Sequence, residues 1–312
     1  MFTARCIGVS LSVFFLLYAG LSLAVARGWK LFVPLCKRLS ARSSANVLFA
    51  LRLLPLAMAS LITLALTVPS FLLLEPRHAD EDIGIAPLLL GFAAIALLIW
   101  GIRLAVAAQR QTSAALAQWL NGAAALPCKA AVPVFKTGKD SPSLTVAGVY
   151  APRVLVSETT MNVLSEPELQ AALRHEMAHV RSRDNLKKLL FRFSAFPGMH
   201  GVEHAWSEVA EMAADADAVS SVRDALDLAA ALIKLSRLAP VQPSAHLATA
   251  LLQRSDALTM RVERLFTWHH APDRKLSWFW CLVPATLSAV LLTASYGTLL
   301  TAMHAVTEWL VR

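Results

Sequence analysis

Four long apolar runs constrain the fold of this chain more than any other feature. Each run is free of charged side chains, and they cover residues 7–26, 53–74, 83–102 and 276–302. About 20 apolar residues are enough for a helix to cross a bilayer. A single run of this kind could be a buried core helix. Four runs, in a chain with 56% hydrophobic and only 16% charged residues, predict a polytopic membrane protein.

The charges between the runs predict how the chain is oriented in the membrane. Between the first two runs there are basic residues and no acidic ones, namely Arg27, Lys30, Lys37, Arg38, Arg42 and Arg52. The next loop is acidic, with Glu75, Asp80, Glu81 and Asp82 against Arg77. Because basic loops stay in the cytoplasm, the long segment 103–275 is expected there too. Much of the net charge of +8 is then an orientation signal, and no basic–aromatic pattern indicates direct nucleic-acid binding.

A cleaved signal peptide is the alternative interpretation of the first run. Arg5 precedes the run, and Ala24-Val25-Ala26 resembles a cleavage site. The run is, however, longer than a typical signal-peptide core, and cleavage would leave the basic loop outside the cell. The charge distribution therefore favours a retained first span.

Residues 175–179 have the sequence His-Glu-Met-Ala-His, which is the HExxH pattern of zinc peptidases. Histidines four residues apart lie on one face of an α-helix, so His175 and His179 can reach one metal ion. Glu176 is offset around the helix and can act as the general base on a water molecule. The preceding residues favour a helix, because Ser165 can cap it and Pro167 is tolerated in its first turn.

A hydrolytic zinc site also needs a third protein ligand and an open position. Glu211, in an Ala-rich helical run over residues 207–221, can supply that ligand. Asp215 lies one turn further on the same face and could hold the free N–H of a ligating histidine. The sequence thus predicts one Zn²⁺ per chain, bound by His175, His179 and Glu211. A purely structural zinc site in a non-catalytic signalling partner is the alternative, although such sites usually have four protein ligands.

Three other polar residues need an interpretation. His200 and His204 form an inverted HxxEH pattern with Glu203. Because Pro197-Gly198 precedes it and Gly201 interrupts it, we expect no regular helix there, and we interpret both histidines as structural or as donors on the substrate side. Asp184 is expected to be structural, either capping the HExxH helix or pairing with Arg181.

The segment between the membrane runs and the HExxH motif is predicted to contain a helix and short strands. A helix is expected over 109–120, and strands over 132–136, 144–150 and 154–157. Zinc peptidases commonly bind the substrate backbone by β-addition to an edge strand near the active-site helix. The fold class is therefore mainly α, a four-span membrane protein with a cytoplasmic α+β zincin-like metallopeptidase domain. The expected parts are a transmembrane region 1–108, a peptidase domain 109–275, and a fourth span with a short tail, 276–312.

Together these motifs resemble the BlaR/MecR-type membrane metallopeptidases, the antirepressor peptidase family. The segments that carry the resemblance are 164–169 (LSEPEL), 175–179 (HEMAH), 180–185 (VRSRDN) and 211–215 (EMAAD), with three spans before the site and one after it. The resemblance implies a zinc endopeptidase in a bacterial-type inner membrane. It would face the cytoplasm and cleave a protein substrate, such as a transcriptional repressor, in signal transduction. The receptor members carry a penicillin-binding sensor domain after the fourth span; the chain stops at Arg312, so direct antibiotic sensing is not implied.

The chain is also similar to the HtpX-type membrane peptidases, which share the HExxH and ExxxD motifs. That alternative implies a quality-control protease of misfolded membrane proteins. Arg261 lies in a segment, 261–265, that resembles an Arg-containing segment of both groups. The resemblance suggests that Arg261 steadies the site or contacts the substrate carbonyl or the transition state. An exposed basic helix face is the alternative. One departure from the antirepressor family is Ala214, where that family often has cysteine.

Overall fold

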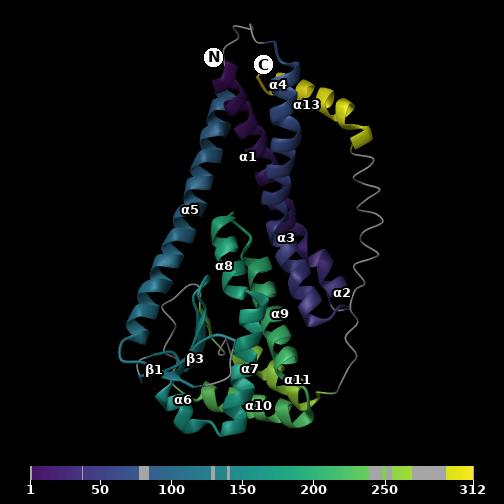
Figure 1. Cartoon of the computed structure of the whole chain (residues 1–312). Coiled ribbons are helices and arrows are strands. Elements are labelled where there is room, and N and C mark those ends of the chain that lie inside the picture. Colours follow the sequence, from purple (N-terminus) through teal and green to yellow (C-terminus); the bar gives the residue numbers. More distant parts are fainter. Residues whose placement is uncertain are drawn as a thin grey trace.

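The computed structural model describes residues 2–36, 38–76, 84–127, 131–138, 141–238, 248–250, 255–268 and 293–311. The described chain is mainly helical and has one small sheet. Long helices meet at the end that holds both termini and diverge toward the other end, where the sheet and the shorter helices lie (Figure 1).

Three helical segments are long and apolar enough to cross a membrane. They are Phe2–Cys36, Ala41–Leu74 and Ile85–Leu120. The first contains α1 (Phe2–Gly28), a short 3-10 turn η1 (Trp29–Phe32) and α2 (Val33–Cys36); the second contains α3 (Ala41–Ile62), a π-helical turn η2 (Thr63–Thr67) and α4 (Val68–Leu74); the third is α5. The three apolar runs before residue 108 are thus confirmed as long helices.

Two of the expected ends agree with the structure: the second helical segment ends at Leu74, and the helix expected over 109–120 ends at Leu120. That helix is continuous with the helix of the third apolar run, which passes Arg103 without a break. A charged residue ends an apolar run without interrupting the backbone hydrogen bonds, so the helix goes on until Leu120, where Asn121 and Gly122 turn the chain.

The fourth predicted span falls largely outside the described residues, which resume at residue 293. The described part contains α13 (Tyr296–Val311), which lies beside α4 (Figure 1). The Tyr296 hydroxyl donates a hydrogen bond of 2.8 Å to the carbonyl of Ala65, within the π-helical turn η2. The count of four spans therefore stays a prediction.

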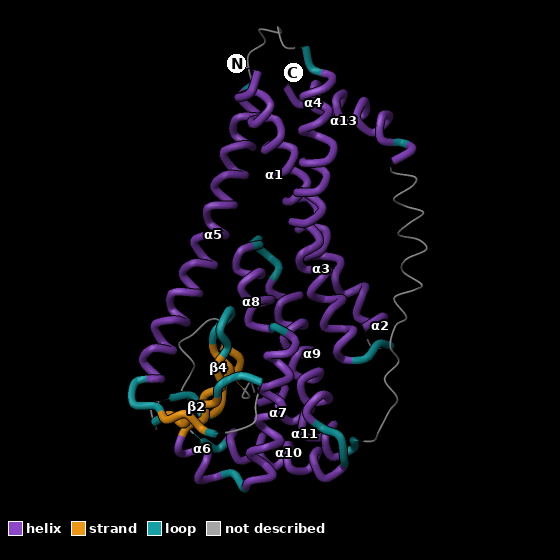
Figure 2. Tube along the Cα trace, in the orientation of Figure 1, coloured by secondary structure: helices purple, strands orange, loops and turns teal. Residues whose placement is uncertain are grey.

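The described sheet has five short strands in the order β1-β2-β4-β3-β5. Its strands are the orange segments of Figure 2, where β2 and β4 are labelled. They are β1 (Ala124–Leu126), β2 (Val134–Thr137), β3 (Leu144–Ala147), β4 (Arg153–Ser157) and β5 (Ala248–Ala250). Strands β2 and β4 are parallel, and the other neighbours are antiparallel. The three predicted strands are confirmed, but β3 ends three residues early, because Gly148 takes a φ of 97° and turns the chain toward β4.

The remaining helices pack around this sheet. They are α6 (Glu158–Val163), α7 (Glu166–Ser182), α8 (Asp184–Phe193), α9 (His200–Ala218), α10 (Val222–Ser236) and α11 (Ser255–Phe266). The largest core cluster joins strand residues such as Val154 with Ala171 of α7 and Leu228 of α10. Helix α7 begins as predicted, because Ser165 and Glu168 form a reciprocal capping box.

Helices α8 and α9 rise between the diverging α5 and α3 (Figure 1). A buried arginine joins them to the membrane helices. Arg52 of α3, only 1% exposed, contacts Glu203 of α9 at 2.8 Å and donates to the Ser194 hydroxyl at 3.1 Å. On the α1 side, the Tyr18 hydroxyl donates to the Ser194 carbonyl at 2.7 Å. Arg52, which we counted with the basic loop, is instead a packing residue inside a helix.

Loss of the ion pair between Arg52 and Glu203 should weaken the packing of α9 against α3 and so lower the stability of the protein. We expect Arg52→Met to lower the free energy of unfolding by about 3 kcal/mol, because it leaves the Glu203 carboxylate without its partner in a largely buried position. Chemical unfolding in detergent would measure the change. Arg52→Met combined with Glu203→Gln should recover part of the loss, and an unchanged stability in the single variant would contradict the assignment.

Candidate metal centre

Three buried ligand groups from two helices meet at one point. The Nε2 atoms of His175 and His179, on α7, lie 3.1 Å apart. A carboxylate of Glu211, on α9, lies 3.4 Å from the first nitrogen and 3.5 Å from the second. All three residues are at most 3% exposed, and one ligand atom from each lies within 4.8 Å of the others. The three residues predicted as zinc ligands are thus brought together as a group that could hold a metal ion.

The Nδ1 atom of each of the two histidines lies beside a carboxylate. The Nδ1 atom of His175 lies 2.9 Å from Oδ1 of Asp215, the distance of the expected pairing, but the two atoms do not meet in hydrogen-bond geometry. The Nδ1 atom of His179 lies 2.7 Å from Oδ2 of Asp184. Both Nδ1 atoms thus face an oxygen, which leaves both Nε2 atoms directed at the centre of the group.

The contact of Asp184 corrects our expectation that it would cap the helix or pair with Arg181. A single residue, Arg183, separates α7 from α8, and its left-handed backbone (φ 53°) reverses the chain direction. The first residue of α8 is thereby turned back onto the last histidine of α7. The signal in the sequence was an aspartate five positions after His179, but only the tight turn gives that spacing its meaning.

Arg261 of α11 lies inside the site, so the interpretation as an exposed basic face was wrong. It is 5% exposed, and its guanidinium donates to both carboxylate oxygens of Asp215 at 2.6 and 2.7 Å. It also contacts Oε2 of Glu211 at 3.0 Å. Burial alone would lower the pKa of Arg261, but Asp215 and Glu211 raise it. Arg261 therefore contacts both carboxylates of α9, and it shares Asp215 Oδ1 and Glu211 Oε2 with His175.

Sequence reasoning also missed Lys188, one turn after Asp184 on α8. Burial lowers the pKa of its ammonium group, and the nearby carboxylates of Glu211, Asp184 and Glu176 oppose that shift. The lysine thus lies within the electrostatic field of the site. Its position on α8 gave no signal, because a lysine in the HExxH neighbourhood looks like any surface residue.

The residues present fit a divalent metal ion. The two imidazole Nε2 atoms lie 3.1 Å apart, where a proton on one of them lets them hydrogen-bond; a divalent cation that replaces this proton would accept a lone pair from each nitrogen. Burial raises the pKa of Glu211, but His179 and Arg261 lower it to about 2, so this carboxylate is charged. Burial lowers the pKa of His175, but Asp215 and Glu211 raise it to about 9, so the site favours positive charge. Two nitrogens and one carboxylate are a common ligand set for a hydrolytic zinc site.

Glu176 lies beside this group without taking part in it. Both of its carboxylate oxygens are buried and have no hydrogen-bond partner among the described residues. Burial raises the pKa of Glu176, while His179 and His175 oppose the shift. A buried carboxylate without a partner is costly, which is consistent with a functional role for its position.

A cavity of about 350 Å³ opens beside His179 and Asp184. Its walls include the turn between β3 and β4, with Gly148 and Tyr150. Asn185 donates from its amide to the carbonyls of Val146 and Gly148 at 3.2 and 3.0 Å, which fixes the end of β3 to the start of α8. The cavity therefore lies between the turn that joins α7 to α8 and the end of β3, and His179 is the metal-compatible residue in its lining.

The edge of β3 is not free. Strand β5 pairs with it in antiparallel register, with Thr145 opposite Ala250. A substrate strand that adds to β3 would have to take the place of β5. Strand β3 lies beside α7, but β4 and β5 flank it in the described sheet, so it is not the edge strand that we expected there.

The inverted HxxEH pattern lies on a regular helix, so our expectation of an irregular segment was wrong. Helix α9 begins at His200, immediately after the glycine turn. Glu203 pairs with Arg52, and His204 lies 3.5 Å from Glu208. Neither histidine belongs to a metal-compatible group within the part of the chain that the structure describes.

The charge on His175 predicts how metal binding depends on pH. With a pKa of about 9, this histidine is protonated at neutral pH in the metal-free protein and must lose its proton to become a ligand. We expect the affinity for Zn²⁺ to rise about tenfold per pH unit between pH 7 and 9, with about one proton released per ion bound. Calorimetry in buffers of different ionisation enthalpy would measure the release, and an affinity independent of pH over that range would contradict it.

The carboxylate of Asp184, which contacts Nδ1 of His179, should affect the metal affinity although it is not one of the three ligands. We expect Asp184→Asn to weaken metal affinity about 10- to 100-fold, because the amide holds the imidazole less firmly and lowers its basicity. Competition with a fluorescent zinc chelator would measure the affinity. Glu166→Gln, at the exposed start of α7, is the matched control and should leave it unchanged.

Hydrolytic metallopeptidase sites are defined by two buried histidines one helical turn apart, a further ligand and a glutamate that can act as base. Here Glu211 of α9 is the further ligand, and Glu176 is a glutamate whose carboxylate has no hydrogen-bond partner among the described residues. The family model of the BlaR1 peptidase M56 matches residues 84–265, which is more than half of the chain and contains the whole site. The chain therefore belongs to this family of membrane metallopeptidases, as the motif resemblance predicted. No curated protein matches the chain.

Proposed function

We propose that this protein is a membrane-embedded, zinc-dependent endopeptidase that cleaves a cytoplasmic protein. The observation that carries the proposal is the buried His175, His179 and Glu211 group with the uncommitted carboxylate of Glu176 beside it. A structural zinc site would use a fourth protein ligand and would have no need for Glu176. Membership of the M56 family supports the same conclusion.

The roles of the residues follow from their positions. A zinc ion held by the three ligands would supply Lewis acidity and lower the pKa of the attacking water to about 7. Glu176 would take the proton from that water and return it to the leaving amine. Asp215 and Asp184 would hold the two imidazoles in the tautomer that leaves Nε2 free, and Arg261 would keep Asp215 and Glu211 charged and in place.

Two further parts of the proposal concern location and substrate. The basic loop after the first span supports an inner-membrane protein whose peptidase part, residues 109–275, faces the cytoplasm. The resemblance to the antirepressor peptidases supports a single regulatory substrate, such as a transcriptional repressor, in a signalling pathway. The lipid bilayer is then the second partner of the chain.

Comparison of newly formed protein N-termini would test the substrate class. Cells that express the wild-type chain would be compared with cells that express Glu176→Gln at equal levels. One cytoplasmic DNA-binding protein cleaved only by the wild type would support the proposal. Many cleaved membrane proteins would instead favour HtpX-type quality control, and no difference under any growth condition would favour a non-catalytic signalling partner.

A further inference from the structure

The two carboxylate oxygens of Asp184 have different partners. Oδ2 lies 2.7 Å from Nδ1 of His179, and Oδ1 accepts a hydrogen bond of 3.2 Å from the ammonium group of Lys187. Asp184 is the first residue of α8, and Lys187 lies one turn further along the same helix. The side chains of Asp184 and Lys187 are only 4% and 15% exposed, so water screens this contact little. The orientation of the carboxylate is therefore fixed from both sides.

Aromatic rings from two other helices lie against the same ammonium group. The Nζ atom of Lys187 is 5.6 Å from the centre of the Phe49 ring, on α3, and 6.0 Å from the centre of the Trp206 ring, on α9. A cation that lies over an aromatic ring within about 6 Å of its centre is attracted to the ring. Both rings pack against a third, that of Phe191 on α8, with ring centres 5.6 and 5.0 Å apart. The rings that receive the ammonium group are thus themselves held in place.

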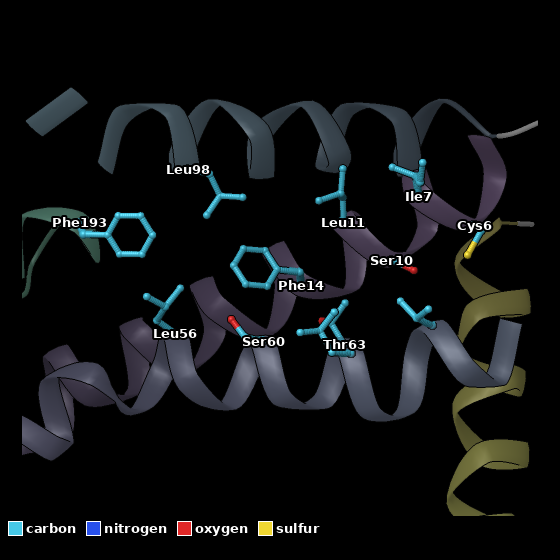
Figure 3. A pocket seen from close by; sticks show the side chains of 12 residues that line it. Cys6, Ile7, Ser10, Leu11, Phe14, Leu56, Ser60, Thr63, Leu98 and Phe193 are labelled. Atoms are coloured by element: carbon cyan, nitrogen blue, oxygen red, sulfur yellow. The ribbon is translucent and has the colours of Figure 1, made fainter. Parts of the chain in front are cut away.

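The other end of α8 is fixed by the long helices. The ring of Phe193, its last residue, points into the apolar space between α1, α3 and α5 (Figure 3). The carbonyl oxygen of Phe193 lies so close to Gly101 of α5 that a Cβ atom there would be 2.1 Å from it. The next residue, Ser194, accepts hydrogen bonds from Tyr18 and Arg52. A change in the first turn of α8 should therefore act locally and not shift the whole helix.

We propose that Lys187 is a positioning residue of the metal centre, which acts through Asp184 on His179. The ammonium group, fixed on the rings of Phe49 and Trp206, holds Oδ1 of the carboxylate. Oδ2 then stays beside Nδ1 of His179 and keeps Nε2 directed at the other two ligands. This role rests on the proposed function, because it concerns the metal ion that this function needs. Since Phe49 belongs to α3, the same contact joins the metal centre to a segment that is long enough to cross a membrane.

Removal of the ammonium group has two effects of opposite sign on the zinc affinity. The carboxylate of Asp184 loses one of its two contacts and holds the imidazole of His179 less firmly, which lowers the affinity. A positive charge near a divalent cation is also lost, which by itself raises the affinity. Only the first effect requires the Asp184 carboxylate. The effect of removing Lys187 must therefore be compared in the presence and in the absence of that carboxylate.

A double-mutant cycle on zinc affinity tests the proposal. Lys187→Met removes the charge and leaves an unbranched apolar side chain on the rings. Competition with a fluorescent zinc chelator would compare the wild-type chain, Lys187→Met, Asp184→Asn and the double variant. We expect Lys187→Met to weaken zinc binding about three- to tenfold in the wild-type background, and to cause no loss where Asp184→Asn is already present. Lys136→Met removes a lysine from the surface pair with Glu158; it is the matched control and should leave the affinity unchanged.

Cobalt and a conservative variant distinguish a change of position from a loss of folded protein. The visible absorption bands of Co²⁺ depend on the geometry of its ligands, so Lys187→Met should shift these bands when Co²⁺ replaces Zn²⁺, and Lys136→Met should not. Lys187→Arg keeps the charge, can still donate to Asp184 and stacks on aromatic rings, so its zinc affinity should stay within about threefold of the wild-type value. Unfolding of each metal-free variant in detergent, measured in parallel, would establish that folded proteins are compared.

The outcomes separate this role from the proposed function. Equal losses of zinc affinity from Lys187→Met in the two backgrounds would show that the lysine does not act through Asp184, and would overturn the proposal. An unchanged affinity and an unchanged Co²⁺ spectrum of Lys187→Met in the wild-type background would overturn it as well. In both cases the wild-type chain binds zinc, so the proposed function stands. If the wild-type chain binds neither Zn²⁺ nor Co²⁺, the proposed function fails and the role of Lys187 fails with it.

Discussion

Glu176→Gln should abolish peptide hydrolysis while the protein keeps its metal. We expect turnover to fall by at least about 10²–10⁴-fold, because the amide cannot take a proton from the attacking water or return it to the leaving amine. The change is nearly isosteric and removes one buried negative charge whose pKa burial already raises, so the fold should tolerate it. Hydrolysis of the substrate found by N-terminal mapping would be measured with purified protein, beside the metal content of each sample.

The outcomes of this experiment separate two kinds of error. If Glu176→Gln cleaves as well as the wild type, Glu176 is not the base, and another group near the metal must have that role. If the variant loses its metal as well as its activity, the residue contributes to metal binding, and the division between ligand and base is wrong. Glu208→Gln, on the partly exposed face of α9, is a matched control for removal of a carboxylate near the site.

Glu211→Ala should remove the metal itself. Elemental mass spectrometry of the detergent-purified wild-type chain should find about one zinc per chain, and the variant should retain less than about a tenth of that. Two histidines alone leave the ion with too few protein ligands, and Arg261, which keeps Asp215, loses one of its two carboxylate partners beside the site. Glu208→Ala, three residues earlier on the same helix, should bind zinc like the wild type.

Zinc retained in Glu211→Ala would mean that a different residue is the third ligand. Asp215 is the nearest alternative on α9, although Arg261 already occupies both of its oxygens. A wild-type chain that holds no zinc even after loading would contradict the peptidase proposal as a whole. It would leave a membrane protein with the family's fold and without its chemistry.

Local patterns made the core of the site predictable. The four-residue spacing of His175 and His179 needs only a helix, and the capping residues before them identify where that helix begins. Glu211 and Asp215 could be assigned because they repeat the same one-turn spacing on a second helix. The three long helices were equally readable, since a run of apolar residues that is long enough to cross a bilayer is a property of the sequence alone.

Contacts between elements could not be read in the same way. The position of Asp184 depends on the left-handed backbone of Arg183, which turns α8 back onto α7. Residues other than glycine seldom adopt this conformation, so the sequence did not predict the turn. Arg52 was counted as a loop charge, because its partners Glu203 and Ser194 are more than 140 positions away. The pairing of β5 with β3 joins strands about 100 residues apart.

The sequence by itself determined that this chain is apolar enough for a membrane and that one helix carries two histidines and a glutamate for a metal site. These features depend on helical periodicity and on hydrophobic length, which act over a few turns. Only the tertiary structure decided that Arg261 lies inside the site, that Asp184 contacts His179, and that Arg52 is buried against α8 and α9. Those arrangements follow from packing between distant segments, where burial makes each charge depend on the partner that the fold brings to it.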